Sequence, residues 1–366
     1  YEPRLARTLA SGERFEVQDP LLMMSEPFSS EAVMHALRDV AVASVDVIET
    51  FRASSAEVAR LRVALSDGRE PFTAIGKSAT GAGLAAARRE LRFFQHLAPC
   101  WDHPAPGLLG AWEERHGEHA RLLLVTEDLG ARGYALPRDG VSEAQLDAVT
   151  DTLATLHTRF WEDLFVEVLD PAHPAPSVTR AAQAWPAGVI GAHAAAARDE
   201  AARFLEAVSA EITVAERALL QDLLEDWEHR FQARAAGGRS ITLIHGDFHL
   251  LGNIFFAADE PRPRVIDWSE LKPGLGPHDL AYCLLSAPAT NRPARDLALL
   301  RRYWEGLRAA GVEAYGWDLC QWDYRFSLLT NLFQSVFQNS LVWFRKTAAL
   351  IAELDCRAAL RSPPPM

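Results

Sequence analysis

The stretch IHGDFHLLGNIFFAADEPRPRVID, at residues 244–267, constrains the fold more than any other part of the chain. Short apolar pieces, TLI before the loop and NIFF and RVI after it, have the composition of strands that flank turns. The loop carries His245, Asp247 and Asn253, and the last apolar piece ends in Asp267. An acid and an amide on one loop, followed by a strand that ends in a second acid, is the arrangement that metal-assisted phosphoryl transfer requires. The pattern therefore predicts a kinase-type active site.

In such a site one carboxylate orients an attacking hydroxyl, while an amide and a second carboxylate hold the magnesium ion that bridges nucleotide phosphates. The alternative is that these residues only form a turn, because Asp and Asn are favoured in turns. The order of His-Gly-Asp, the downstream Asn and the strand-terminal Asp favours the active site.

Upstream, the sequence predicts a small sheet with strands at residues 42–51, 56–65 and 71–79. Ser66-Asp67-Gly68 is a hairpin signal between the second strand and the third. Lys77 lies at the end of the third strand, and Glu90 lies on an Ala-rich helix predicted at residues 83–97. A strand lysine paired with an acid of the next helix holds the α- and β-phosphates in kinase-type sites. The alternative for Lys77 is a solvated surface lysine.

The segment RLLLVTEDLG, at residues 121–130, reads as an apolar strand that runs into an acidic connector ending in Gly. It fits the link between a small β lobe and a larger helical lobe. We expect backbone groups near Glu127 and Leu129 to form hydrogen bonds with the adenine edge of a nucleotide. A core strand followed by a polar turn is the plainer interpretation, and both can hold together.

These residues together resemble the aminoglycoside phosphotransferase and choline kinase-like family, which includes the ecdysteroid kinase-like phosphotransferases. The resemblance extends from about Ala41 to about Leu350 and is most specific at HGDFHLLGN, VIDWSE and GPHDLAY. It implies an α+β, bilobal protein kinase-like fold. The expected domains are a small N-terminal lobe with an antiparallel β-sheet at residues 1–130 and a larger, mainly helical C-terminal lobe at residues 131–366.

The resemblance also implies the reaction and its partners. The expected enzyme is a phosphotransferase with an alcohol group as acceptor. It would move the γ-phosphate of ATP, or of GTP, to a hydroxyl of an antibiotic, a sugar or an amino alcohol, with Mg²⁺ as cofactor. Carried over residue by residue, the resemblance makes Asp247 the catalytic base and His245 a brace for its loop. Asn253 and Asp267 become the magnesium ligands, and Asp279 would form hydrogen bonds behind the loop.

Two departures from the family pattern leave alternatives open. Five residues, 248–252, separate Asp247 from Asn253, where the family has four. We expect Gly252 to supply the backbone freedom for a one-residue bulge that still delivers Asn253. The loop TFRASSAE, at residues 50–57, contains no Gly. A catalytically weak pseudokinase that binds nucleotide is therefore one alternative.

A second alternative is a metal-dependent phosphohydrolase. His245, Asp247 and His249 would point to one face if they lay on a strand, and could then share a metal. In the kinase interpretation, His249 instead supports the catalytic loop. Protein kinase activity is disfavoured, because Gly246 stands where protein kinases carry Arg and eleven residues between Asp267 and Asp279 leave no room for an activation loop.

The C-terminal region is dense in aromatic residues between Trp317 and Phe344. Their helical spacing favours packing in the core. If some of the rings instead face the cleft, they would line an acceptor pocket for a flat or hydrophobic alcohol, and a polycationic acceptor would become less suitable. Asn331, Gln334 and Gln338 could then donate hydrogen bonds to the acceptor.

The rest of the second lobe reads as helices. A helix capped by Ser142 is predicted to run to Trp161, and long helices are predicted at residues 192–209 and 214–235. His157 is interpreted as a packed helix residue rather than a catalyst. Four prolines at residues 171–186 predict an irregular crossing or substrate loop.

Composition excludes several classes of partner. The formal net charge of −12 over 366 residues disfavours binding to nucleic acid or to an anionic membrane surface. The sequence contains no run of eighteen apolar residues, so it predicts no membrane span. The four cysteines are far apart and read as reduced core thiols, which suits the cytoplasm. The expected partners are a nucleoside triphosphate and a small alcohol.

Overall fold

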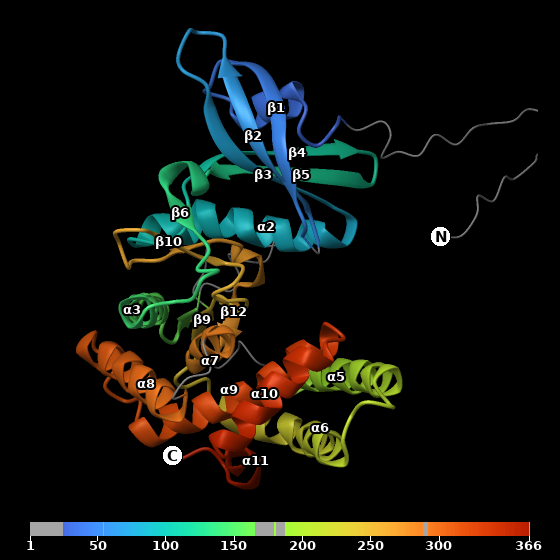
Figure 1. Cartoon of the computed structure of the whole chain (residues 1–366), viewed down its shortest axis with the longest axis vertical. Coiled ribbons are helices and arrows are strands. Elements are labelled where there is room, and N and C mark those ends of the chain that lie inside the picture. The colour runs from blue at the N-terminus through green and yellow to red at the C-terminus, as the bar shows by residue number, and fades with distance from the viewer. Residues whose placement is uncertain (1–24, 54, 165–178, 181–186, 288–291, 366) are drawn as a thin grey trace, which may run out of the picture. The chain divides into compact units, whose positions relative to one another are not determined.

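The computed structural model describes residues 25–53, 55–164, 179–180, 187–287 and 292–365 (Figure 1). The chain divides into two compact units. The first contains the described residues up to Leu84 together with Leu108–Glu127, and the second contains Ala85–Gly107 together with the described residues from Asp128 onward. Glu90, which falls in the predicted lobe at residues 1–130, thus groups with the second unit.

The first unit is built on a five-stranded antiparallel sheet in the order β1-β2-β3-β5-β4 (Figure 1). Its elements are α1 (Ser30–Ala36), β1 (Val42–Phe51), β2 (Glu57–Leu65), β3 (Phe72–Thr80), a short 3₁₀ turn η2 (Gly81–Gly83), β4 (Leu108–His116) and β5 (His119–Glu127). The first three strands lie where the segments rich in Val, Ile, Phe and Ala predicted them. A turn at residues 66–68 joins β2 to β3, as the hairpin signal indicated.

The core of this unit follows from alternation along the strands. In β2, Ala59, Leu61 and Val63 are buried, while the arginines between them lie nearer the surface. The buried face packs with Ala32 and Val33 of α1 in one hydrophobic cluster. Burial of one face per strand fixes the register, because a slip by one residue would expose these side chains.

The second unit is mainly helical. Its principal helices are α2 (Leu84–Arg92), α3 (Glu143–Arg159), α5 (Ala187–Ala207), α6 (Val214–Ala235), α7 (Pro277–Ser286), α8 (Arg292–Ala309), α9 (Trp317–Phe337), α10 (Leu341–Glu353) and α11 (Ala358–Arg361). Helix α2 continues as a π-helical turn, η3 (Phe93–Leu97), and three 3₁₀ turns, η4 (Ala98–Cys100), η5 (Gly130–Arg132) and η7 (Trp268–Glu270), connect other elements. Helix α7 packs against α9, and α3 packs against α8.

Local signals explain several of these helix ends. The Ser142 hydroxyl accepts a hydrogen bond from the Gln145 backbone, and the Gln145 side chain accepts one from the Ser142 backbone. Thr213 and Glu216 form the same reciprocal pair at the start of α6. Each pair satisfies two backbone donors that have no partner within the helix, so both helices begin where the capping pattern predicts.

Short strands carry the predicted catalytic segment in the second unit. They are β6 (Tyr134–Ala135), β7 (Asp163–Leu164), β8 (Thr179–Arg180), β9 (Thr242–Ile244), β10 (Ile254–Ala257), β11 (Arg264–Val265) and β12 (Lys272–Gly274). Strand β9 pairs with β12, β10 lies between β11 and β6, and β7 pairs with β8, all antiparallel.

The predicted fold class is confirmed: an N-terminal antiparallel sheet is followed by a mainly helical part. Of the cysteines, Cys283, Cys320 and Cys356 are buried thiols, whereas Cys100 is exposed and so is not the core thiol that was expected. None of the helices formed by the described residues is both long enough and apolar enough to span a bilayer.

Candidate active site

The predicted catalytic loop begins at the end of β9, whose three residues are all buried. Ile244 pairs with Lys272 of β12, so the residue before the loop is held by strand pairing. Gly246 then adopts a positive φ of 83°. A Cβ at this position would lie 2.5 Å from the backbone oxygen of Glu270. The site therefore requires glycine both for its conformation and for space, which explains why no larger side chain stands here.

Asp279 holds the start of the loop from behind, as predicted. Its carboxylate is fully buried and accepts hydrogen bonds from the backbone N–H of His245 at 2.6 Å and of Gly246 at 2.9 Å. His157 of α3 lies 3.2 Å from the same carboxylate through Nε2, and its Nδ1 lies 2.8 Å from the Tyr303 hydroxyl. His157 is thus a buried helix residue, as interpreted from the sequence, and it links α3 to the loop through Asp279.

The charge state of Asp279 follows from these contacts. Burial by itself would raise the pKa of this carboxyl group, but the hydrogen bond and charge of His157, with smaller effects of His245 and His278, lower the pKa below its ordinary value. The ionised carboxylate can accept hydrogen bonds at both oxygens, as the two backbone donors require.

His245 braces the loop with both ring nitrogens. Its Nε2 donates to the backbone oxygen of Ile266 at 3.0 Å, and its Nδ1 accepts from the backbone N–H of Asp247 at 3.3 Å. The ring is fully buried. These contacts contradict the hydrolase alternative, because residues 245–249 form a loop rather than a strand and both nitrogens of His245 are engaged. Among the described residues, no group of three or more His, Cys, Asp or Glu side chains is placed to hold a metal.

Asp247 and Asn253 lie together despite the extra residue between them. The Asn253 side-chain amide donates to the Asp247 carboxylate and to the Asp247 backbone oxygen, each at 2.8 Å. The backbone N–H of Asn253 donates to the His249 oxygen at 3.1 Å, which closes the intervening residues into a turn. The bulge expected from the spacing thus brings the amide to the acid.

Gly252 has a different role from the one predicted. It is not among the residues with positive φ, so backbone freedom does not explain it. A Cβ at Gly252 would lie 2.3 Å from the His249 ring, and the glycine therefore makes space for that ring. The His249 ring also lies beside the Tyr282 ring, with centroids 5.7 Å apart. His249 packs across the turn and supports it, consistent with the supporting role expected for it.

Asp267 follows β11 in a left-handed conformation with φ and ψ both 62°. Asp tolerates this region better than most residues, but at a cost of order 1–3 kcal/mol that neighbouring contacts must offset. The Ser269 hydroxyl donates to Asp267 Oδ1 at 2.7 Å. The next residue, Trp268, is fully buried and stacks on Phe93 with ring centroids 4.1 Å apart. Because Ile266 N–H donates to the Asn253 oxygen at 3.0 Å, Asp267 is held beside the catalytic loop.

Glu90 contacts this same segment. Its Oε1 accepts a hydrogen bond from the Trp268 backbone N–H at 3.2 Å, and its side chain is buried. Arg89 donates to the Ser269 backbone oxygen at 2.5 Å. Helix α2 therefore anchors the residues that follow Asp267, a contact that the sequence did not predict. The ion pair of Glu90 with Lys77 stays a prediction.

One face of α7 contacts the catalytic loop along its length. Asp279 binds the start of the loop, and the Ser286 hydroxyl accepts from the Leu250 backbone N–H at 3.1 Å near its end. Between them, Tyr282 lies close enough to Asp247 for the charge of that carboxylate to act on its hydroxyl. Burial, followed by the charge of Asp247, raises the pKa of Tyr282, so its hydroxyl stays protonated and can donate.

Tyr282 and Ser286 were missed by the sequence analysis. They lie three and seven residues after Asp279, a spacing that places all three on one helix face. That spacing was the available signal, since GPHDLAY had already been singled out. The position of the loop against this face depends on tertiary packing and could not be read from either segment alone.

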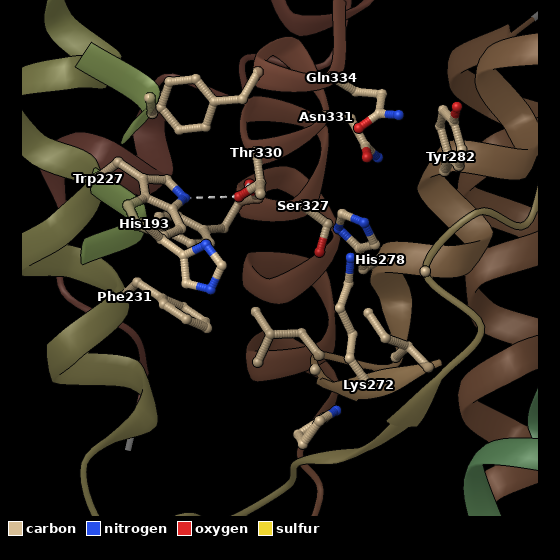
Figure 2. Close-up of a pocket in the computed structure, with 18 of the residues that line it drawn as sticks. His193, Trp227, Phe231, Lys272, His278, Tyr282, Ser327, Thr330, Asn331 and Gln334 are labelled. Carbon is tan, nitrogen blue, oxygen red and sulfur yellow. Dashed lines mark hydrogen bonds between the residues drawn. The ribbon is translucent and has the colours of Figure 1, made fainter. Parts of the chain in front are cut away.

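A cavity of about 200 Å³ adjoins the loop (Figure 2). It is lined by Gly246 and Tyr282 from the loop region, by α5, α6 and β12, and by several residues of α9. Among the aromatic residues of the C-terminal region, Phe326, Phe333 and Phe337 line the cavity, together with Asn331 and Gln334. Other rings are core residues, as the helical spacing favoured: Trp322, Tyr324 and Phe344 are buried away from the cavity lining.

His278 makes the stability of this region sensitive to pH. It is partly buried beside Asp279, Lys272 and His157, and removal from water is the main reason why its pKa falls from 6.5 to about 4. The unfolded chain therefore binds a proton at higher pH than the folded chain does. We expect the free energy of unfolding to be unaffected by this group above pH 6.5 and to lose about 3 kcal/mol as the pH falls to 4.

Urea unfolding of the wild type and of His278→Gln across this pH range measures the effect. Other groups titrate in both proteins, so the informative quantity is the difference between the two curves. The variant should lose less stability than the wild type between pH 6.5 and pH 4. Parallel curves would show that His278 does not titrate as described.

The predicted nucleotide contacts lie partly in the first unit. Lys77 is a half-buried residue of β3 and pairs with Val58 on one side and Leu124 on the other. Glu127 is the last residue of β5. The Leu129 carbonyl accepts hydrogen bonds from the backbone N–H groups of Arg132 and Tyr134. It is therefore already engaged as an acceptor. The contacts of Lys77, Glu127 and Leu129 with a nucleotide stay predictions.

Two predicted segments lie wholly or partly outside the described residues. In the Gly-free loop at residues 50–57, Ser54 is not described. The proline-rich segment at residues 171–186 is described only at Thr179–Arg180, where β8 pairs with β7.

Comparison with known proteins identifies the family. The sequence profile of the phosphotransferase enzyme family matches residues 50–315, which is more than two thirds of the chain. The chain belongs to the phosphotransferase enzyme family. No curated protein sequence gives a significant match to this phosphotransferase.

Solved structures similar to the phosphotransferase include kinases of small molecules. An ethanolamine kinase from Plasmodium vivax is 12% identical, with 86% of this chain and 82% of that chain covered and a TM-score of 0.51. An aminoglycoside phosphotransferase from Streptomyces rimosus is 19% identical, with 79% of this chain and 92% of that chain covered and a TM-score of 0.46. The family profile thereby confirms the predicted family and a phosphotransferase, and the likeness to the ethanolamine kinase confirms the kinase-like fold.

Proposed function

We propose that this phosphotransferase transfers the γ-phosphate of ATP, or of GTP, to the hydroxyl of a small molecule in a magnesium-dependent reaction. The observation that carries the proposal is the position of Asp247. Its carboxylate is held by the Asn253 amide at 2.8 Å, and Tyr282, whose hydroxyl is close enough to be affected by the Asp247 charge, lines the adjoining cavity. An acceptor in this cavity would thus have a positioned carboxylate beside it.

In the proposed reaction, Asp247 is the general base. It accepts the proton of the acceptor hydroxyl as the hydroxyl oxygen bonds to the γ-phosphorus. The bond from that phosphorus to the bridging oxygen breaks, and the nucleoside diphosphate leaves. Asn253 fixes the carboxylate in place, and His245 with Asp279 fixes the backbone of the loop, so little reorganisation is needed at the moment of transfer.

The residues present suit Mg²⁺. Asn253 directs its Nδ2 to Asp247, which turns its Oδ1 away from that carboxylate, and Asp267 supplies carboxylate oxygens on the neighbouring segment. Oxygen atoms of this kind are the ligands that Mg²⁺ prefers. The ion, when bound with a nucleotide, would neutralise charge on the phosphates. Lys77 is proposed to contact the α- and β-phosphates, and the connector near Glu127 and Leu129 to contact the base.

A thermodynamic test of this proposal uses nucleotide and magnesium together. We expect ATP or GTP with Mg²⁺ to raise the free energy of unfolding by about 2.7 kcal/mol at a hundredfold excess over Kd. The increase should depend on Mg²⁺, and Asp267→Asn should remove most of that dependence. Denaturant unfolding with each nucleotide, with and without Mg²⁺, measures it.

Asp259→Asn is the matched control, because Asp259 is an exposed acid between β10 and β11, on the same part of the chain. It should behave as the wild type does. Stabilisation without phosphate transfer to any alcohol would favour the pseudokinase alternative. No stabilisation by either nucleotide would refute the kinase proposal.

A further inference from the structure

The charged side chains that line the cavity beside Asp247 do not suit a polyamine. Among the described residues that line it, none is Asp or Glu. Its one lining residue with a permanent positive charge is Lys272 of β12, again within the described part of the chain. A cationic acceptor would meet the Lys272 ammonium without a lining carboxylate to offset the repulsion.

Two buried polar groups of α9 point to a ligand in this cavity. Ser327 is 1% exposed and Asn331 is 4% exposed, and both line the cavity. The Ser327 hydroxyl and the Asn331 Nδ2 have no hydrogen-bond partner among the described residues. Buried polar groups are normally paired, because leaving one unpaired is costly. The Asn331 Nδ2 can only donate a hydrogen bond, and the Ser327 hydroxyl can donate as well as accept, so one acceptor in the cavity would pair both groups.

Lys272 lines the same cavity as Ser327 and Asn331. In Figure 2 its side chain extends towards Ser327 and His278. Its ammonium has a distant ion-pair partner in Glu270, at 3.9 Å, and the Glu270 side chain is half exposed. Burial, with the charge of Lys272, lowers the pKa of His193 and of His278, so both line the cavity as neutral rings. Among the described residues that line the cavity, Lys272 therefore carries the only charge.

The remaining wall of the cavity is aromatic. Trp227 and Phe231 of α6 stack with ring centroids 5.2 Å apart, and Phe231 stacks on Phe326 of α9 at 6.1 Å. Trp227 is fixed by a hydrogen bond from its indole N–H to the Thr330 hydroxyl at 2.9 Å, which Figure 2 shows. These rings give the cavity an apolar aromatic wall, which suits a ligand with an apolar, aromatic body.

We infer that the acceptor is an alcohol with a flat apolar body and an anionic group such as a carboxylate, the anion binding Lys272, Ser327 and Asn331 while the hydroxyl faces Asp247. This inference rests on the proposed function, in which the acceptor occupies this cavity. The aromatic wall contacts the apolar body. The anionic group accepts hydrogen bonds from Lys272 and from Ser327 and Asn331, the two residues of α9 whose Oγ and Nδ2 atoms have no other partner in the described part of the chain. Gly246 and Tyr282 connect the cavity to the catalytic loop, so the hydroxyl is the end that reaches Asp247.

Three probes that share one skeleton separate charge from shape. They are 3-hydroxy-2-phenylpropanoate, which is anionic, its methyl ester, which is neutral, and 2-phenylglycinol, which is cationic near neutral pH. Each carries the same phenyl ring and a primary hydroxyl. Isothermal titration calorimetry of the full chain should show the anion binding at least about tenfold more tightly than the cation, with the ester between them.

Variants locate the preference in the cavity. Lys272→Glu should reverse the order of the anion and the cation, and Lys272→Gln, which keeps the length of the side chain, should reduce the preference towards unity. Asn331→Leu should weaken the anion and the ester by about tenfold. Lys346→Glu is the matched control, because it makes the same charge change at an exposed residue of α10 that does not line this cavity. It should leave the order unchanged.

The outcomes separate the inference from the proposed function. The inference is overturned if the anion binds no more tightly than the cation, or if the anion does not bind at all. The inference is also overturned if Lys346→Glu abolishes the preference for the anion as fully as Lys272→Glu does. Magnesium-dependent stabilisation by nucleotide is measured on the same preparation, and its absence counts against the proposed function alone. The expected order, reversed by Lys272→Glu, supports the inference.

Discussion

Replacing Asp247 by Asn is expected to lower the rate of phosphate transfer by about 10²- to 10⁴-fold and to leave nucleotide binding nearly unchanged. The amide has the shape of the carboxylate and can still accept the hydrogen bond from Asn253, so the loop keeps its geometry. It cannot accept the proton of the acceptor hydroxyl, because an amide is not a base at neutral pH. The measurement is the turnover of ATP with an acceptor that the wild type phosphorylates.

Two further measurements make this result specific to Asp247. Stabilisation by ATP and Mg²⁺ should persist in Asp247→Asn, which shows that the variant is folded and binds nucleotide. Asp259→Asn, at an exposed acid of the same segment, should turn over at the rate of the wild type. Near-normal turnover in Asp247→Asn would exclude this residue as the base.

The second large effect is expected from Asp279→Ala, which should lower the free energy of unfolding by about 3–5 kcal/mol. The substitution removes one buried carboxylate and leaves three donors unpaired: the backbone N–H groups of His245 and Gly246 and the ring of His157. Because the first two belong to the catalytic loop, the rate should fall as well. Urea unfolding monitored by circular dichroism gives the stability.

Asp318→Ala is a suitable control for this variant. Asp318 is also an acid in the first turn of its helix, α9, but it is exposed. Both substitutions remove a favourable charge near a helix N-terminus, which is worth only about 0.3–1 kcal/mol. If the two variants lost similar amounts of stability, the hydrogen bonds of Asp279 would contribute little to folding.

The sequence predicted those parts of the molecule whose signals are local. The bounds of β1 and of α6 coincide with the predicted segments, because the composition of the first and the Ala/Leu/Glu-rich run of the second are signals that act over a few residues. The candidate catalytic loop was singled out for the same reason, since HGDFHLLGN is contiguous. The bulge that brings Asn253 to Asp247 was also expected. The role predicted for Gly252 was wrong, because only the folded turn shows that the His249 ring lies over this residue.

Contacts between distant segments could not be predicted in this way. Nothing in the sequence near Glu90 indicates that its carboxylate binds the backbone of Trp268, 178 residues away. The aromatic residues of α9 divide between core and cavity according to the helices that pack on each face, so their spacing left both interpretations open. The unpaired state of Ser327 and Asn331 is likewise a property of the packed structure.

The three contacts of α7 with the catalytic loop have a consequence for protein engineering. Asp279, Tyr282 and Ser286 meet the loop at its beginning, at Asp247 and at Leu250. We therefore expect the loop and the helix to be transferable only together. A chimera that received the loop without this helix would lack the hydrogen bonds to His245, Gly246 and Leu250, whereas a graft of both segments would carry its own support.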